Sequence, residues 1–318
     1  MKIESLSATP FEVLARAFGA AFSDYEVQID PAELRAMLRR RGFDPSLSFA
    51  AFDEAEHKGV IAGFTLNGIG TFNGRATAYD TGTGTLPAYR GEGLASRIFT
   101  ASLPLLRRAG VEHYILEVLQ HNEAAISLYR RLGFRVRREF NYFRATAEEV
   151  GAATGRAATE NGSATGNPAE NGNRAGISIR PIAPTDRVLF APGFRDFEPS
   201  WQNSPEAIGR APEDFIALGA FPPGAFLPGA FPRSEEPTPL GYIVFDPSAG
   251  DITQIAVCES HRRRGIGSAL LCEMLRLNRA GSVKCLNTEI GRDGSIAGFL
   301  LARGIAHAGR QFEMGLEI

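Results

Sequence analysis

A turn within residues 85–96 has the composition of an anion-binding site. It contains Arg90-x-x-Gly93-x-Ala95, and Gly91 and Gly93 carry no side chains that would keep a ligand from the backbone. The apolar spacing that follows predicts that a helix begins here. The first N–H groups of a helix have no intrahelical partner and lie at the positive end of its dipole. The turn therefore predicts a site for a diphosphate.

The same construction occurs a second time, at residues 262–267, with the sequence Arg-Arg-Arg-Gly-Ile-Gly. Each turn lies between a predicted strand and a predicted helix. These are residues 75–85 and 94–108 for the first turn, and 251–257 and 264–279 for the second. One such motif is a weak signal, but two with similar flanks are a much stronger one.

Composition limits the classes of protein. The net charge of −2 disfavours a general nucleic-acid binder, which would carry a strong basic excess. No run approaches the length of a membrane helix, and no signal peptide is apparent, so we expect a cytoplasmic protein. The cysteines (Cys258, Cys272, Cys285) lack the spacing of a disulfide framework or a zinc site, and we expect no metal.

The length of 318 residues suits two domains of about 150 residues each. Residues 146–176 are rich in Ala, Thr, Gly, Asn and Glu and contain no aromatic residue. Such a segment buries too little apolar surface to offset its ordering entropy, which predicts a disordered linker. The expected domains are therefore residues 1–145 and 177–318.

A short predicted helix over residues 122–132 adds a tyrosine to the first domain. Asn122, Ile126 and Tyr129 lie along one side of it, with Asn122 at a favourable N-cap position and Gly133 suited to a left-handed C-terminal residue. This geometry projects Tyr129 from the last helical turn toward whatever the Gly-rich turn holds.

The two motifs together resemble the GNAT acyltransferase superfamily. The residues in question are Arg90-x-x-Gly93-x-Ala95 and Asn122-x-x-Ala125-x-x-x-Tyr129-x-x-x-Gly133-Phe134, and a weaker copy covers 177–318. The resemblance implies an α/β fold (a mixed, mostly antiparallel sheet, splayed at its centre) in two tandem domains. We expect a monomer in which the two domains pair as an internal pseudo-dimer. The resemblance also implies acetyl-CoA as acyl donor and a small-molecule or peptide amine as acceptor.

By the same resemblance, certain residues would bind acetyl-CoA. In the first domain they are Thr85, Leu86, Arg90, Gly91, Glu92, Gly93, Leu94, Ala95, Ser96 and Asn122. In the second they are Val257, Arg262, Arg263, Arg264, Gly265, Ile266, Gly267 and Ser268. The turn backbone would hold the pyrophosphate, while Thr85, Leu86 and Asn122 would contact the pantetheine arm.

The resemblance also assigns chemistry. Tyr129 would protonate the departing CoA thiolate as general acid, because a phenol pKa is close to that of a thiol leaving group. Asp80 and Glu117 are the expected bases for the amine proton. The loop residues Asp24, Tyr25 and Glu26 would attract a cationic acceptor, though all three also suit an ordinary surface loop.

The second copy departs from the pattern at the position of the tyrosine that would act as general acid. Aligning Gly133-Phe134 with Gly304-Ile305 places Asp293 at Asn122 and Leu300 at Tyr129, and leucine cannot protonate a thiolate. The sequence leaves open whether this copy binds CoA. A non-catalytic CoA-binding regulatory protein is the principal alternative. A dinucleotide-binding protein is less consistent, because position 96 is Ser where that fingerprint has its third Gly.

Overall fold

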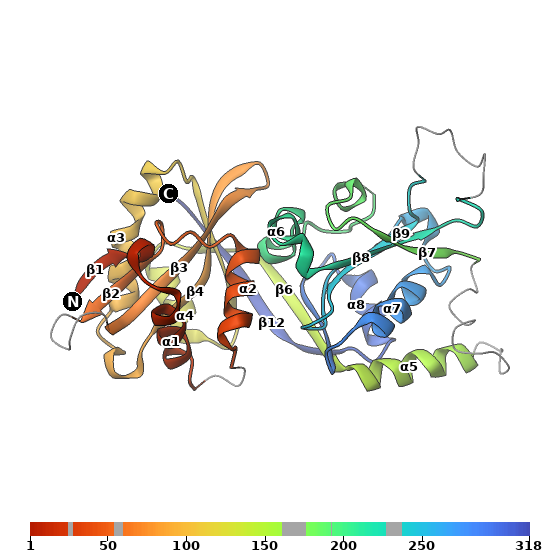
Figure 1. Ribbon diagram of the computed structural model, residues 1–318, viewed down its shortest axis with the longest axis horizontal. Helices are drawn as coiled ribbons and strands as arrows, with labels where there is room; N and C mark the ends of the chain where they lie inside the picture. The colour runs from red at the N-terminus through yellow and green to blue at the C-terminus, as the bar shows by residue number, and fades with distance from the viewer. Residues whose placement is uncertain (25–27, 54–59, 161–175, 192, 227–236) are drawn as a thin grey trace. The chain divides into compact units, whose positions relative to one another are not determined.

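The computed structural model describes residues 1–24, 28–53, 60–160, 176–191, 193–226 and 237–318. The chain divides into two units. Unit 1 comprises Met1–Arg138 together with Phe312–Ile318, and unit 2 comprises Glu139–Gln311. Both units combine helices with a mixed sheet, so the predicted α/β class is confirmed (Figure 1).

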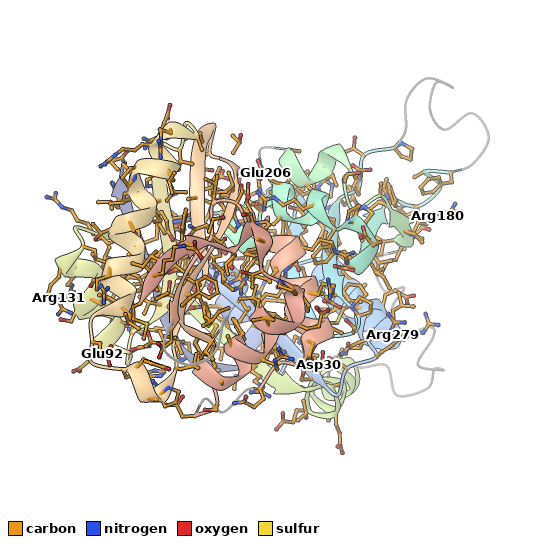
Figure 2. The ribbon with its side chains drawn as sticks, turned by 60° about the vertical axis from the view of Figure 1, so that its left-hand side comes forward. Asp30, Glu92, Arg131, Arg180, Glu206 and Arg279 are labelled. Atoms are coloured by element: carbon orange, nitrogen blue, oxygen red, sulfur yellow. The ribbon has the colours of Figure 1, made fainter. Side chains whose placement is uncertain are left out.

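The elements of unit 1 are β1 (Lys2–Ser5), α1 (Phe11–Ala21), α2 (Pro31–Arg41), β2 (Phe49–Asp53), β3 (Val60–Phe72), β4 (Arg75–Thr85), α3 (Leu94–Arg108), β5 (His113–Leu119), α4 (Glu123–Arg131) and the start of β6 (Arg135–Thr146). Local signals set several boundaries. Asp30, labelled in Figure 2, caps α2 in a reciprocal capping box with Glu33, and Pro31 occupies the first helical position.

The sheet of unit 1 has helices on both faces. Its strand order is β1-β2-β3-β4-β5-β12, antiparallel up to β4 and parallel between β4 and β5. Helices α1 and α2 pack with β3 in one core cluster. Helices α3 and α4 pack with β4 and β5 in another, on the opposite face. The side chains of each strand alternate between these two environments.

The last strand of unit 1 comes from the far end of the sequence. β12 (Ala306–Glu317) lies partly in each unit, and its residues from Phe312 onward belong to unit 1 (Figure 1). Met314 is fully buried in the α3–α4 cluster. Beside it, Arg138 Nε and Nη2 donate to the two carboxylate oxygens of Glu313 at 2.9 and 2.6 Å. The predicted boundaries therefore change, because the second domain does not keep residues 312–318.

The elements of unit 2 are the end of β6, α5 (Ala147–Glu160), β7 (Ser178–Ile182), α6 (Pro205–Arg210), β8 (Ile216–Phe221), β9 (Gly241–Asp246), β10 (Asp251–Val257), α7 (Ile266–Leu277), β11 (Ser282–Glu289), α8 (Gly294–Leu301) and the start of β12. The strand order is β7-β8-β9-β10-β11-β6, with β10 and β11 parallel. This repeats the arrangement of unit 1.

One predicted segment is corrected. Residues 147–160, expected within a disordered linker, form helix α5, and Val150 is fully buried in the core of unit 2. The helix begins with a capping box that the composition argument overlooked. Thr146 Oγ1 accepts from the Glu149 amide at 3.1 Å, and Glu149 accepts from the Thr146 amide at 2.8 Å. The linker residues 161–175 lie outside the described residues.

Candidate active site

Both predicted anion turns have the geometry that their sequences imply. Gly91, Gly93 and Gly265 have φ values of +85°, +70° and +85°, and no atom lies within 4 Å of where a Cβ would stand at any of them. Left-handed backbone, and not crowding by protein, therefore favours glycine at these positions. Helices α3 and α7 begin directly after Gly93 and Gly265 without a side-chain cap, which leaves their first amides facing open space.

The strands beside each turn separate. In unit 1 the pairing of β4 with β5 ends at Tyr79–Ile115, although the strands continue to Thr85 and Leu119. In unit 2 the pairing of β10 with β11 likewise ends at Ile252–Cys285, before the strands end. Backbone groups along the separated edges are thus placed to pair with an extended ligand such as a pantetheine arm.

The first arginine of the motif makes bonds within the protein. Arg90 donates to both carboxylate oxygens of Asp24 at 2.8 and 3.1 Å, to the Ala21 carbonyl at 2.9 Å, and to the Thr85 carbonyl at 3.3 Å. Its hydrogen bond lowers the pKa of Asp24. Arg90 therefore ties the segment after α1 to the end of β4. Asp24, expected to attract an amine, is already paired, while Tyr25 and Glu26 lie outside the described residues.

Unit 2 repeats this arrangement, in which an arginine bonded to an aspartate ties a loop to the end of a strand. We call it the clamp. Arg262 Nε donates to the Val257 carbonyl at 3.1 Å, and Nη2 contacts Asp196 at 2.9 Å and the Phe194 carbonyl at 3.4 Å. Sequence analysis placed Arg90 and Arg262 among the CoA-binding residues. In the structure both guanidinium groups hold a loop against the strand end that precedes the turn.

Tyr129 and Asp80 are brought together in unit 1. Tyr129 donates its hydroxyl hydrogen to Asp80 Oδ2 at 2.9 Å. Asp80 also accepts from the Gly82 amide at 2.9 Å and from Thr83 Oγ1 at 2.7 Å. Burial raises the pKa of Asp80, and the three hydrogen bonds oppose that rise without cancelling it. A β-bulge at Thr81 shifts the register with β3 at this point of the strand.

The other expected base, Glu117, lies on the opposite face of the sheet. Alternation along β5 separates it from Leu116 and Val118, which pack against α3 and α4. Glu117 instead adjoins Tyr79 and hydrogen-bonds to its hydroxyl, and the Arg41 guanidinium lies 5.8 Å from the Tyr79 ring centre. Burial above all raises the pKa of Tyr79 well beyond the ordinary value. The two expected bases thus do not converge on one point.

Two predicted contacts with the pantetheine arm involve groups with partners in the protein. The Leu86 amide donates to the Ala62 carbonyl at 2.9 Å, so this N–H is not available for the expected role. Asn122 is the predicted N-cap: its Oδ1 accepts from the Ala125 amide at 3.1 Å. Gly133 has the expected left-handed conformation, with φ +96°.

In unit 2 the positions that correspond to Tyr129 and Asp80 hold apolar residues. Leu300, at the position of Tyr129, is fully buried in the core. Ile252 precedes Arg262 by the same number of residues as Asp80 precedes Arg90, and it adjoins a matching register shift at Thr253. Ile252 packs in the same core cluster as Leu300. Asp293 makes no capping bond and accepts from Asn141 and Thr288, each at 2.8 Å.

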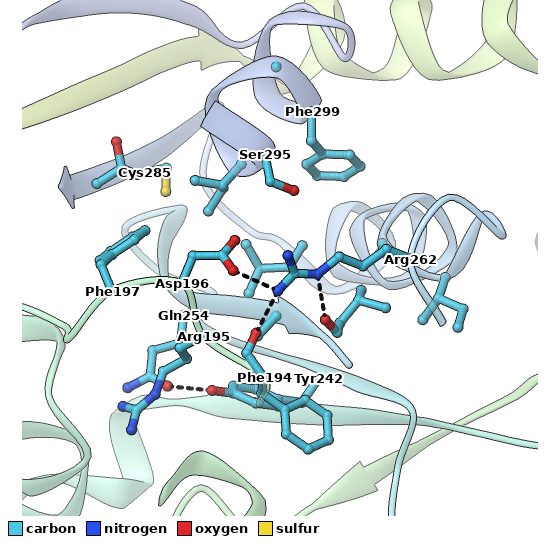
Figure 3. A pocket seen from close by; sticks show the side chains of 18 of the residues that line it. Phe194, Arg195, Asp196, Phe197, Tyr242, Gln254, Arg262, Cys285, Ser295 and Phe299 are labelled. Atoms are coloured by element: carbon cyan, nitrogen blue, oxygen red, sulfur yellow. Dashed lines mark hydrogen bonds and ion pairs between the residues drawn. The ribbon is translucent and has the colours of Figure 1, made fainter. Parts of the chain in front are cut away.

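A cavity of about 590 Å³ lies in unit 2, between the β10–α7 turn, the separated strands and α8 (Figure 3). Its lining includes every second-domain residue predicted to bind CoA except Arg264. A smaller cavity of about 340 Å³ in unit 1 lies away from the turn, beside α1 and α2.

One wall of this cavity is a buried network of neutral side chains that sequence analysis missed. Tyr242 donates to Gln254 Oε1 at 3.0 Å (Figure 3). Gln254 Nε2 donates to the Asn203 carbonyl at 2.7 Å, and Asn203 Nδ2 donates to the Leu286 carbonyl at 2.9 Å. Asn287 takes a left-handed φ of +61° beside a register shift of β11. These contacts join distant segments, so no local motif announces them.

Two kinds of feature are absent among the described residues. No group of three or more His, Cys, Asp or Glu side chains there is placed to hold a metal ion. No helix in the same part of the chain is both long enough and apolar enough to span a bilayer.

Comparison with curated proteins finds acetyltransferases. The chain is 33% identical over 107 residues to N-alpha-acetyltransferase 30 of Schizosaccharomyces pombe, a match covering 31% of this chain and 65% of that protein. It is 35% identical over 127 residues to mycothiol acetyltransferase of Saccharomonospora viridis, covering 38% and 40%. The chain therefore spans less than two thirds of the length of these relatives.

Solved structures share the fold along the whole chain. A tandem GNAT protein from the clavulanic acid biosynthesis pathway superposes with a TM-score of 0.66 at 12% identity, covering 99% of this chain and 98% of that one. A GCN5-related N-acetyltransferase from Sphaerobacter thermophilus gives 0.62 at 16% identity, covering 99% and 95%.

The model of the acetyltransferase (GNAT) family matches residues 11–134, in unit 1, and residues 194–297, in unit 2. Together these segments make up most of the chain. The protein is therefore a member of the GNAT acetyltransferase family, with one family segment in each of its two units.

Proposed function

We propose that unit 1 transfers an acetyl group from acetyl-CoA to a primary amine of a small molecule or peptide. The observation that carries the proposal is the 2.9 Å hydrogen bond from Tyr129 to the buried Asp80 carboxylate. This pair lies where β4 separates from β5, in the unit that also holds the Gly91–Gly93 turn. Family membership supports the reaction class and leaves the acceptor open.

The residues of unit 1 suit the donor. The amides at the start of α3, together with the open space at Gly91 and Gly93, fit a pyrophosphate, while the separated edge of β4 fits pantetheine amides. Glu92 is exposed and projects outward (Figure 2), so its carboxylate does not fill the turn. When bound, acetyl-CoA supplies the acetyl group and leaves as a thiolate that requires one proton.

The pair Tyr129–Asp80 supplies a path for that proton. The attacking amine sheds one proton as its bond to the acetyl carbon forms, and Asp80 accepts it directly or through one water molecule. Tyr129 gives its hydroxyl proton to the sulfur and regains one from Asp80 across their hydrogen bond. One proton thus moves from nitrogen to sulfur. The raised pKa of Asp80 favours its role as base, because the carboxylate binds a proton more readily.

Tyr129→Phe is the decisive variant. Loss of a general acid lowers kcat by ~10²–10⁴, and CoA affinity should stay within about twofold because the phenyl ring retains its packing. The measurement is thiol release from acetyl-CoA with a panel of peptide α-amines and small primary amines. Tyr89→Phe is the matched control, because Tyr89 also donates to an aspartate, Asp53, at 2.9 Å in the same unit. Equal kcat in the two variants would remove Tyr129 from the mechanism.

Asp80→Asn and Glu117→Gln distinguish the two bases. The raised pKa of Asp80 predicts that kcat falls with acidification at a pH above the ordinary aspartate range, because protonation removes the base. Asp80→Asn should abolish this limb of the pH–rate profile and lower kcat by ~10²-fold or more. Glu117→Gln should keep the limb. The opposite result would assign the base to Glu117.

A second candidate function applies to unit 2, which we propose binds CoA without catalysing transfer. The supporting observations are the cavity lined by the second turn and the buried Leu300 at the position that corresponds to Tyr129. Turnover that survives in Tyr129→Phe at the wild-type rate would contradict this division of roles between the units.

A further inference from the structure

The cavity of unit 2 has a strongly positive lining. Among the described residues that line it, four are arginines (Arg195, Arg262, Arg263, Arg303) and one is acidic, Asp196. Asp196 is already paired with Arg262 at 2.9 Å. The remaining three arginines therefore give the cavity an excess of positive charge, which predicts an anionic ligand.

These arginines are found in two places. Arg263 belongs to the β10–α7 turn, and Arg303 donates to Ser268 in the first turn of α7 at 2.7 Å, so both lie at the end suited to phosphate. Arg195 comes instead from the segment before β8, next in sequence to Asp196 of the clamp. In the view of Figure 3 it lies apart from Arg262.

Few interactions offset the free-energy cost of burying the Arg195 guanidinium. Its side chain is 18% exposed, and its ion-pair partner Glu198 is 3.9 Å away and 63% exposed. Nη1 is buried and has no hydrogen-bond partner in the protein. A buried cation with an unused donor is costly, so such a group calls for a partner that the protein itself does not supply. A ligand in the cavity that Arg195 lines would be that partner.

The surroundings of Arg195 indicate what kind of anion fits. The neighbouring lining residues Tyr242, Gln254 and Asn203 are neutral and bonded to one another or to backbone. Arg195 also opposes, through its charge, the burial that raises the pKa of Tyr242 to about 12. One guanidinium among neutral groups matches a singly charged, planar anion bound by two parallel hydrogen bonds, that is, a carboxylate.

We propose that the cavity of unit 2 binds a carboxylate at Arg195, at a subsite separate from the anion turn. The carboxylate is either the end of an acyl group carried on CoA or a free carboxylic acid bound beside CoA. The proposal goes beyond acetyl transfer by unit 1 and does not depend on it.

The single tryptophan of the chain provides a readout confined to unit 2. Trp201 is fully buried there and is two residues from Asn203, which lines the cavity. Fluorescence titration of the full-length protein should compare succinyl-CoA with butyryl-CoA, two four-carbon acyl groups of which only the first ends in a carboxylate. A third titration adds succinate in the presence of saturating CoA.

We expect succinyl-CoA to bind about tenfold to a hundredfold more tightly than butyryl-CoA, the usual range for a hydrogen bond to a charged group. Arg195→Gln should abolish that preference, Arg195→Lys should retain part of it, and the control Arg276→Gln, on the exposed side of α7, should leave it unchanged. If the two thioesters bind equally but succinate binds only when Arg195 is present, the carboxylate comes from a separate acid, which also supports the proposal.

Two results would overturn the proposal. One is the absence of any carboxylate-dependent change with all three probes. The other is a preference for succinyl-CoA that persists in Arg195→Gln while the melting temperature shows that this variant is folded. Neither result bears on the Tyr129→Phe experiment, which reports on unit 1.

Discussion

The two units share a scaffold and differ in the groups that can move a proton. Each ends a central strand with an arginine–aspartate clamp, Arg90–Asp24 or Arg262–Asp196, and then turns into a helix through left-handed glycine. At the acid position, unit 1 has Tyr129 hydrogen-bonded to Asp80, whereas unit 2 has Leu300 and Ile252 in one apolar cluster. Both polar members of the pair are replaced together.

This difference teaches that the scaffold around the turn does not depend on the groups that we propose to transfer the proton. The clamp, the turn and the separated strands form without the polar pair, as unit 2 demonstrates. Replacement of one member alone would leave a buried carboxylate or hydroxyl without its partner, which is costlier than replacing both with apolar groups. The pair therefore behaves as a single structural and chemical element.

The strongest test of this comparison transfers the apolar pair into unit 1. The double variant Asp80→Ile with Tyr129→Leu should lower kcat by ~10²–10⁴, no more than the loss from Tyr129→Phe alone, because residues that act as a unit are not additive. Its unfolding should remain cooperative. Steady-state kinetics and chemical denaturation are the measurements. A further large loss beyond the single variant would mean that the two residues act independently.

A smaller effect is expected at the two turns. Gly93→Asp and Gly265→Asp each place an anion where a pyrophosphate would bind, and each should weaken CoA binding in its own unit by roughly 10–100-fold through like charge and left-handed strain. Calorimetric titration with CoA, which gives the number of binding sites and their affinities, measures this effect. Gly93→Asn and Gly265→Asn are controls of similar size that carry no charge. If Asp and Asn variants bind CoA equally, the turns do not hold the diphosphate.

The clamps should show the smallest effects. Arg262→Gln should cost roughly 1 kcal/mol of unfolding free energy, because its ion pair is partly exposed. Arg90→Gln should cost less, since Arg90 and Asp24 are 43% and 56% exposed. Thermal melts of both variants beside the wild type measure this. A larger loss of stability in Arg90→Gln than in Arg262→Gln would show that exposure does not rank the two ion pairs.

The Arg90 clamp also has a pH signature. Because Arg90 lowers the pKa of Asp24, the stabilisation is present above the ordinary value of 3.8 and is lost as pH falls through the lower folded-state pKa. The difference in melting temperature between wild type and Arg90→Gln should therefore disappear under acidic conditions. A difference that persists there would mean that the carbonyl contacts, and not Asp24, provide the stabilisation.

Local features were predictable from sequence. The left-handed Gly93 and Gly133 and the caps at Asp30 and Asn122 depend on neighbouring residues, so their spacing identifies them. Helix α5 was missed although Thr146-x-x-Glu149 is a capping-box pattern, because composition outweighed it.

Features that depend on distant contacts could not be predicted. The Arg90–Asp24 pair joins segments far apart in the sequence, and so does the wall formed by Asn203, Gln254 and Leu286. Arg195 carries no motif at all; only its burial in the folded cavity distinguishes it from surface arginines.

The assignment of residues 312–318 to unit 1 has a consequence for synthesis on the ribosome. Most of unit 1 precedes unit 2 in the sequence, yet the fully buried Met314 and the partner of Arg138, Glu313, emerge only after all of unit 2. Until the intervening residues have been translated, unit 1 therefore has an incomplete core, and its strand β5 has no β12 beside it. Truncation after Gln311 would leave every residue of unit 2 in place and remove Phe312–Ile318 from unit 1.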